Sequence, residues 1–175
     1  MSLNIESAQP ADLKRLTEIY NYYILHSHAT FDIDEYSINK RQSWFQIFSD
    51  KGAHRLFVAR QEGTILGYAS STPLHSKPAY HTSVETTIYV DPLHLGRGIG
   101  YKLYHRLIYT LEQEKTVHRA FAGIALPNED SAILHQRLGF KLIGIFQEVG
   151  FKFGRYWDVA WYDRDVSMQT LEPLS

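Results

Sequence analysis

Three glycines at alternating positions, Gly96, Gly98 and Gly100, separate a strand-like run from a helix-like run. The run before them, residues 83–90, reads SVETTIYV and is dense in β-branched residues, which is typical of a central strand. In the run after them, residues 101–115, leucine and isoleucine recur along one face of a helix. We therefore expect a strand, a glycine-rich loop and a helix to follow one another here.

The remaining chain alternates strand-like and helical patterns and contains no internal repeat or long linker. Read in order, the patterns predict strand, helix, helix, three strands, helix, strand, helix and two long strands. The expected helices cover residues 11–27, 39–52, 101–115 and 128–139; the expected strands lie within residues 3–10, 55–72 (a hairpin), 83–90, 120–126, 140–154 and 155–166. This order favours an α/β sheet with both parallel and antiparallel pairs.

The chain has 175 residues, a length that fits one domain, which we expect to cover residues 1–166. Residues 167–175 are expected to form a loose C-terminal tail. The absence of cysteine excludes disulfides, a thiolate metal site and a cysteine nucleophile. The nine histidines are scattered, without a pair at helical spacing, so we expect no metal.

The formal net charge of -1 gives no broad attraction to nucleic acid or to an anionic membrane, and we expect neither as a partner. No apolar run approaches the roughly 20 residues that span a bilayer. The first residues lack the basic and then apolar pattern of a signal peptide. These features are compatible with a cytoplasmic protein, which is the location that we expect.

The glycine loop itself is suited to binding an anion. Glycines allow positive φ angles and a close approach of a ligand to the backbone, and the following helix adds unpaired amides and the positive end of its dipole. Two known phosphate-binding motifs do not match: Gly100 is not followed by Lys and Ser/Thr, and Tyr101 or Leu103 stands where a dinucleotide fingerprint needs a third glycine. From the loop alone, a plain turn and a ligand loop remain equally supported.

Four motifs that follow one another along the chain favour the ligand loop over the plain turn. They are YHTSVETTIYVDP (80–92), LGRGIG (95–100), GIALPNEDSAILHQRLGF (123–140) and GFKFGRYWDVAWYDRDV (150–166). Together they resemble the GNAT acetyltransferases, and within them the phosphinothricin N-acetyltransferase-type enzymes, over residues 8–166. The resemblance implies a GNAT fold, which has a mixed, mostly antiparallel sheet of six to seven strands flanked by about four helices. It further implies acetyl-CoA as cosubstrate, a homodimer, and a direct acetyl transfer to the free amine of a small amino-acid analogue such as phosphinothricin, methionine sulfoximine or methionine sulfone.

The resemblance also assigns the cofactor site. In the family, a Gln/Arg-x-x-Gly-x-Gly/Ala loop wraps the pyrophosphate of acetyl-CoA; Leu95 departs from the pattern at the first position, so the backbone must do most of the binding. The strand before the loop is expected to pair with the pantetheine arm like an added strand. Asn128 and Ser131 would cap the next helix, and the Asn128 side chain would also reach that arm. The implied cofactor residues are Ile88, Tyr89, Val90, Leu95, Gly96, Arg97 at the rim, Gly98, Ile99, Gly100, Asn128 and Ser131.

Acetyl transfer to an amine requires a base for the ammonium proton and a donor near the departing sulfur. Glu85 is the only acid in its strand, and partial desolvation would raise its pKa toward a useful range. A lone glutamate on a strand more often faces solvent, but the resemblance makes Glu85 the base, acting directly or through a water. His135 stands where the resemblance places a hydrogen-bond donor to the thiolate; a core or surface histidine is an equally weighted reading.

The resemblance places the amine pocket around residues 29–32, which include Phe31, and around Tyr80 and the pair Tyr156 and Trp157, although aromatic residues as often belong to a core. Lys77 occupies the place where related enzymes carry an arginine, and we expect it to orient an anionic group of the substrate. Two other functions stay open. One is an N-acetyltransferase for a peptide N-terminus or a polyamine, which would need an open acidic groove. The other is an acyl-CoA-binding module without turnover, against which the retention of Glu85 and His135 argues.

Overall fold

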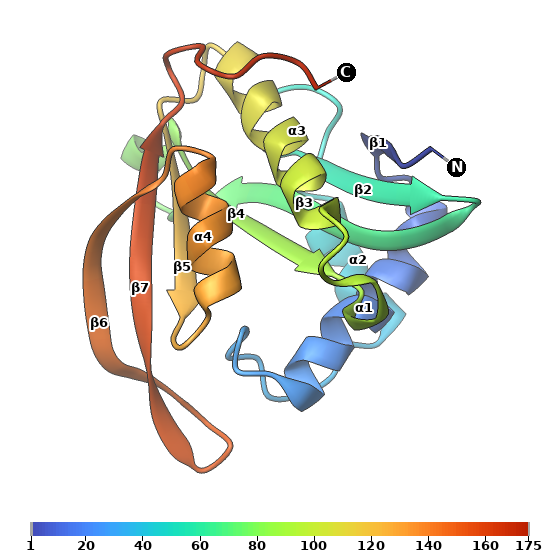
Figure 1. The fold of residues 1–175 in the computed structure, drawn as a ribbon, viewed down its shortest axis with the longest axis vertical. Helices are drawn as coiled ribbons and strands as arrows, with labels where there is room; N and C mark the ends of the chain where they lie inside the picture. Colours follow the sequence, from blue (N-terminus) through green and yellow to red (C-terminus); the bar gives the residue numbers. More distant parts are fainter. Residues whose placement is uncertain (1, 175) are drawn as a thin grey trace.

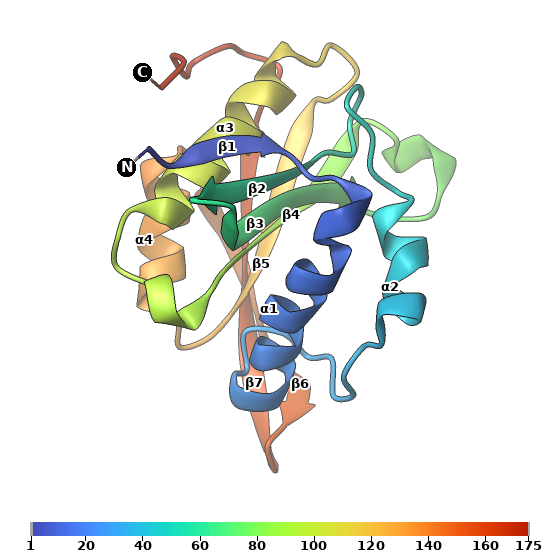
Figure 2. The same cartoon turned by 90° about the vertical axis from the view of Figure 1, so that its right-hand side faces the viewer.

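The computed structural model describes residues 2–174 and shows one seven-stranded sheet with helices on both faces (Figures 1 and 2). The strands are β1 (Asn4–Ser7), β2 (Leu56–Gln61), β3 (Thr64–Pro73), β4 (Ser83–Val90), β5 (Arg119–Ala125), β6 (Lys141–Lys152) and β7 (Arg155–Asp165), and the helices are α1 (Leu13–His26), α2 (Ile38–Phe45), α3 (Ile99–Gln113) and α4 (Glu129–Arg137). The sheet order is β1-β2-β3-β4-β5-β7-β6, antiparallel except for the β4–β5 pair. The predicted fold class and order of elements are confirmed.

Within the described residues, no helix combines the length and apolarity that crossing a bilayer requires.

Successive side chains of β2 point to opposite faces of the sheet, so that the interior has two hydrophobic layers. Leu56 and Val58 point to the face that is covered by α1, where they pack with Leu16 and Ile19. The intervening Phe57 joins the larger cluster under α3 on the opposite face. Figure 2 shows α1 and α2 on one side of the sheet and α3 and α4 on the other. The period-2 pattern of the strand therefore separates the two layers, as the geometry of a strand requires.

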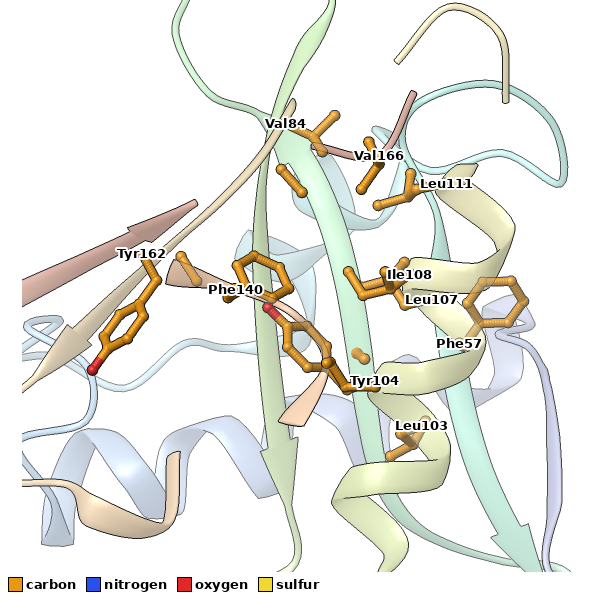
Figure 3. Packing of buried hydrophobic residues seen from close by; sticks show 14 of the residues in the cluster. Phe57, Val84, Leu103, Tyr104, Leu107, Ile108, Leu111, Phe140, Tyr162 and Val166 are labelled. Carbon is orange, nitrogen blue, oxygen red and sulfur yellow. The ribbon is translucent and has the colours of Figure 1, made fainter. Parts of the chain in front are cut away.

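Helix α3 is held against the sheet by a row of fully buried side chains (Figure 3). Leu103, Leu107, Ile108 and Leu111 are each 0% exposed, and burying each such side chain contributes about 1.5–3 kcal/mol. The helix also needs the glycine below it, because a Cβ at Gly67 would lie 2.8 Å from a backbone oxygen of β4 and 3.2 Å from the Leu103 side chain. This packing sets the N-terminus of α3 beside the end of β4.

The second predicted helix is wrong at its C-terminal end. We expected it to run to Gly52, but α2 ends at Phe45. Beyond it the chain continues in turns, in which the Phe48 amide donates to the Phe45 carbonyl at 3.3 Å. These turns place Phe48 on the α1-side cluster, with its ring centroid 4.8 Å from that of Trp44. Packing on the core therefore overrides the helical pattern of this segment.

The expected loose C-terminal tail is tied to α3 at residues 170–171. The Leu171 amide and the Thr170 hydroxyl donate to the carboxylate of Glu112 on α3, at 3.0 and 2.8 Å. Arg164 of β7 donates to the same carboxylate and to Thr170. Leu171 packs against the core beneath. A buried carboxylate that accepts several hydrogen bonds thus fixes residues 170–171, a nonlocal contact that composition does not reveal.

Candidate active site

Strands β4 and β5 run parallel only at their start and then separate. Their register pairs Ser83, Val84 and Glu85 with residues 119–121, and in the described chain no pair follows. Beyond this point β4 stays paired with β3 and β5 with β7, so that each presents a free backbone edge to the other. The two strands thus enclose a V-shaped gap. At its narrow end, where the strands separate, Thr86 Oγ1 donates to the Phe121 carbonyl at 3.0 Å. The gap can therefore accept an extended ligand that pairs with backbone groups like an added strand.

The first cavity, of about 550 Å³, occupies this gap and continues to the starts of α3 and α4. Ten of the eleven predicted cofactor residues line it: Ile88, Tyr89, Val90, Leu95, Gly96, Gly98, Ile99, Gly100, Asn128 and Ser131. The eleventh, Arg97, is exposed and lies outside the lining. His135 lines the same cavity. The structure thus brings these residues together from three segments, residues 88–90, 95–100 and 128–135.

The glycine loop gives the first cavity an end whose backbone is suited to an anion. Gly98 is the N-cap of α3 and adopts a left-handed conformation, with φ 72° and ψ 5°. The first hydrogen bond of the helix runs from the Lys102 amide to the Gly98 carbonyl at 3.2 Å, so that the amides before Lys102 have no acceptor within the helix. Asp91 holds the entrance of the loop, since it accepts from the Leu93 amide at 2.9 Å and pairs with Arg15. Unpaired amides and the helix dipole together favour a phosphate here.

Replacing Gly98 with alanine is expected to weaken acetyl-CoA binding by about tenfold. A residue with a Cβ pays about 1–2 kcal/mol in this left-handed conformation, which the loop must adopt when it binds the phosphates. Isothermal titration with CoA measures the effect. Gly52→Ala is the matched control, because Gly52 has a similar φ of 83° and an equally open surrounding but lies outside the cavity. Equal CoA affinity in the two variants would contradict the assignment.

A second cavity, of about 660 Å³, lies on the α1–α2 side of β4. Its lining includes Glu85, Asp32 and Arg41, together with several aromatic side chains. Thr87 and Tyr89 line both cavities. A group bound in the first cavity and a group bound in the second would therefore meet at β4, close to Glu85.

Glu85 has the environment of a base. Its side chain is half-buried, and desolvation raises the pKa of its carboxyl above the ordinary value. A raised pKa brings a carboxylate closer to the range in which it can accept a proton at neutral pH. The desolvation predicted from the β-branched neighbours is thus present.

His135 is only 3% exposed, and burial lowers the pKa of its imidazole to about 4. Its Nδ1 lies 2.7 Å from the carbonyl of Ser131. Because a carbonyl oxygen can only accept, Nδ1 carries the proton, and Nε2 of the neutral ring is an acceptor. The predicted donor role of His135 stays a prediction. To donate from Nε2, the ring must either shift its proton from Nδ1 to Nε2 or take up a second proton.

Four of the predicted substrate residues do not line either cavity, namely Phe31, Lys77, Tyr80 and Tyr156. Phe31 packs against Gly150 of β6 so closely that a Cβ there would collide with its ring. Lys77 is exposed in the loop before β4, where Tyr80 stacks on His75 at 5.1 Å between ring centroids. Tyr156 is exposed on β7. Their contact with substrate therefore stays a prediction.

Sequence reasoning missed the aromatic and charged lining of the second cavity. Arg41, Trp44, Tyr20 and Tyr68 line it without having been predicted, whereas Asp32, which also lines it, belongs to the predicted segment 29–32. A signal existed for one of them: Arg41 stands three, four and seven residues before Trp44, Phe45 and Phe48, so that it belongs to the apolar stripe of its segment. An arginine in such a stripe faces the interior rather than the solvent.

Comparison with known proteins agrees with this geometry. The profile of the acetyltransferase (GNAT) domain family matches residues 5–161. A phosphinothricin N-acetyltransferase of Streptomyces coelicolor is 52% identical over 157 residues, which cover 89% of this chain and 91% of the relative. An L-methionine sulfoximine/L-methionine sulfone acetyltransferase of Salmonella typhimurium is 34% identical, covering 90% and 91%. A solved phosphinothricin acetyltransferase of Sinorhizobium meliloti in complex with AcCoA superposes with a TM-score of 0.87 at 32% identity, covering 94% of this chain and 89% of that one.

Proposed function

The chain belongs to the GNAT acetyltransferase family, and from this membership we propose that it acetylates the free amine of a small amino-acid analogue. It is an N-acetyltransferase that uses acetyl-CoA. The proposed substrates are of the phosphinothricin, methionine sulfoximine or methionine sulfone type, after which the relatives described above are named. Since acetyl-CoA is an intracellular metabolite, we place the reaction in the cytoplasm.

One observation carries the proposal. Two cavities share Thr87 and Tyr89 of β4, one reaching the glycine loop and the other containing Glu85. Acetyl-CoA in the first cavity would present its thioester at β4, and an amine in the second would lie beside the carboxylate. This supports direct transfer between the two substrates, without a covalent enzyme intermediate.

In the proposed mechanism, Glu85 takes a proton from the substrate ammonium, directly or through a water. The freed amine attacks the thioester carbonyl carbon, and the C–N bond forms. The C–S bond then breaks, the nitrogen gives up its second proton, and the CoA thiolate takes up one proton. The raised pKa of Glu85 supports the first step. His135, which lines the first cavity, is the proposed hydrogen-bond donor to the sulfur, in the state that carries a proton on Nε2.

The test is to mix the protein and acetyl-CoA with free amino acids, phosphinothricin, methionine sulfone, methionine sulfoximine, polyamines and peptides, and to follow thiol release. We expect turnover with the amino-acid analogues. Turnover confined to polyamines or peptides would overturn the proposed substrate class. Tight CoA binding with no thiol release across the panel would indicate a binding module instead.

We also propose that the protein is a homodimer that is formed through the ribbon of β6 and β7. Figure 1 shows this ribbon extending beyond the rest of the sheet. Eight apolar side chains along it are between 47% and 59% exposed in the single chain: Leu142, Ile143, Ile145, Phe146, Val149, Phe151, Phe153 and Tyr156. Strand β6 is also the edge of the sheet. A contiguous apolar edge of this kind favours a self-complementary contact with a second copy.

The double variant Ile143→Glu/Val149→Glu is expected to weaken dimerisation by about 100-fold or more, because each interface would bury unpaired charges. Sedimentation at several protein concentrations measures the effect. Met168→Glu is the control, since Met168 is an exposed apolar residue of similar exposure away from the ribbon. A wild type that sediments as a monomer, or a double variant as dimeric as the control, would disprove the ribbon contact.

A further inference from the structure

Helix α2 directs a cation into the protein. Arg41 is its one buried residue among exposed and half-buried neighbours, with 6% of its surface exposed. A buried guanidinium loses much hydration, and proteins ordinarily compensate this with a carboxylate partner. No ion pair within residues 2–174 includes Arg41. The compensating anion must then come from elsewhere or be missing.

The contacts that Arg41 does make leave most of its donors unused. Nη2 donates to the Tyr68 hydroxyl at 3.3 Å. The guanidinium carbon lies 3.7 Å from the ring centroid of Trp44 and 4.3 Å from that of Tyr20, which are cation–π distances. The Nε atom is buried and has no hydrogen-bond partner. The aromatic rings hold the guanidinium in place without satisfying its N–H groups.

Arg41 also faces the place where the proposed acceptor binds, because it lines the second cavity together with Glu85. Asp32 lines the same cavity and accepts from the Tyr20 hydroxyl at 2.5 Å. The cavity therefore presents one unpaired cation and two carboxylates. An α-amino acid carries the complementary charges, an ammonium for the carboxylates and a carboxylate for the guanidinium.

We infer that Arg41 binds the α-carboxylate of the substrate through its unpaired N–H groups and so selects amino acids over simple amines. The inference rests on the proposed function and deepens it. A planar guanidinium held between aromatic rings is preorganised for a bidentate contact with a carboxylate, which a flexible ammonium cannot reproduce. In this arrangement the amine is directed toward Glu85. Arg41 then binds the anionic group of the substrate, which is the role that was predicted for Lys77.

The test compares methionine sulfone with its α-carboxamide, which keeps the amine and the side chain but lacks the carboxylate charge. The measured quantity is the ratio of kcat/KM for the acid to that for the amide. We expect Arg41→Met to lower this ratio by about 10- to 100-fold. Arg41→Lys, which keeps the charge and loses the fork, should restore part of it. Arg106→Met is the control, because Arg106 also lies over an aromatic ring but lines neither cavity.

Acetyl-CoA affinity shows whether each variant is folded, since Arg41 does not line the cofactor cavity. A wild type that acetylates neither the acid nor the amide overturns the proposed substrate class, whatever Arg41 does. A wild type that prefers the acid while Arg41→Met keeps the same ratio overturns the Arg41 inference alone. The Arg41 inference also fails if Lys77→Met abolishes the preference for the acid and Arg41→Met does not.

Discussion

Replacing Glu85 with glutamine is expected to lower kcat by about 10²- to 10⁴-fold, the usual contribution of a positioned general base. Glutamine keeps the shape of the side chain but cannot take a proton from the ammonium. The KM for acetyl-CoA should not change, because Glu85 lines the second cavity and not the first. Glu62→Gln is the control, since Glu62 is an exposed glutamate in the β2–β3 turn. Turnover close to wild type in Glu85→Gln would disprove the assignment.

The pH dependence of kcat tests the role of Glu85 independently. A base works only when ionised, so the wild-type kcat should fall as the pH drops through the raised pKa of Glu85. This fall should be absent from the residual activity of Glu85→Gln. A pH profile that keeps the same acidic limb in the variant would assign that limb to another group.

Stability should respond to Glu85→Gln in the opposite sense from activity. The folded pKa of Glu85 is raised, so its ionised form is less favourable in the folded than in the unfolded chain. This penalty is fully present above the folded pKa and disappears below the unfolded value of about 4.3. Glu85→Gln should therefore unfold at a higher temperature than the wild type at neutral pH, and the difference should vanish in acid. Thermal unfolding at both pH values measures this.

Replacing Arg164 with methionine is expected to lower the free energy of unfolding by about 3–5 kcal/mol. The Arg164 and Glu112 side chains are only 5% and 0% exposed, and they form an ion pair. Arg164 also donates to the Leu138 carbonyl at the end of α4. Its removal would leave a buried carboxylate without its counter-ion and a carbonyl without its donor. Urea denaturation of the wild type and the variant measures the loss.

The double variant Arg164→Met/Glu112→Leu separates the ion pair from its surroundings. Because it removes both charges, its loss should be smaller than the sum of the two single losses. The exposed pair of Arg60 and Glu6 is the contrast, and Glu6→Gln should cost no more than about 1 kcal/mol. Strictly additive losses at positions 112 and 164 would show that the buried pair is not coupled.

Much of the lining of the first cavity could be predicted because its signals are local. The β-branched run forms β4, the loop before α3 carries left-handed Gly96 and Gly98, and Asn128 caps α4 by accepting from the Ser131 amide at 3.2 Å. These features depend on neighbouring residues only, and the order of elements then brings them to one gap. The second cavity is different, since its lining comes from α1, α2, β3 and β4 and from loops between them.

The sequence by itself determined the order of strands and helices, the glycine turn before α3 and the identity of the single acid on β4, because hydrophobic period, caps and glycine conformations act within a few residues. Only the tertiary structure decided where β4 leaves β5, that Arg41 is buried without a carboxylate, and that Glu112 ties residues 170–171 to α3. The physical reason is that desolvation and charge pairing depend on which distant segments surround a side chain. An arginine or a glutamate looks the same along the chain whether water or a packed interior surrounds it.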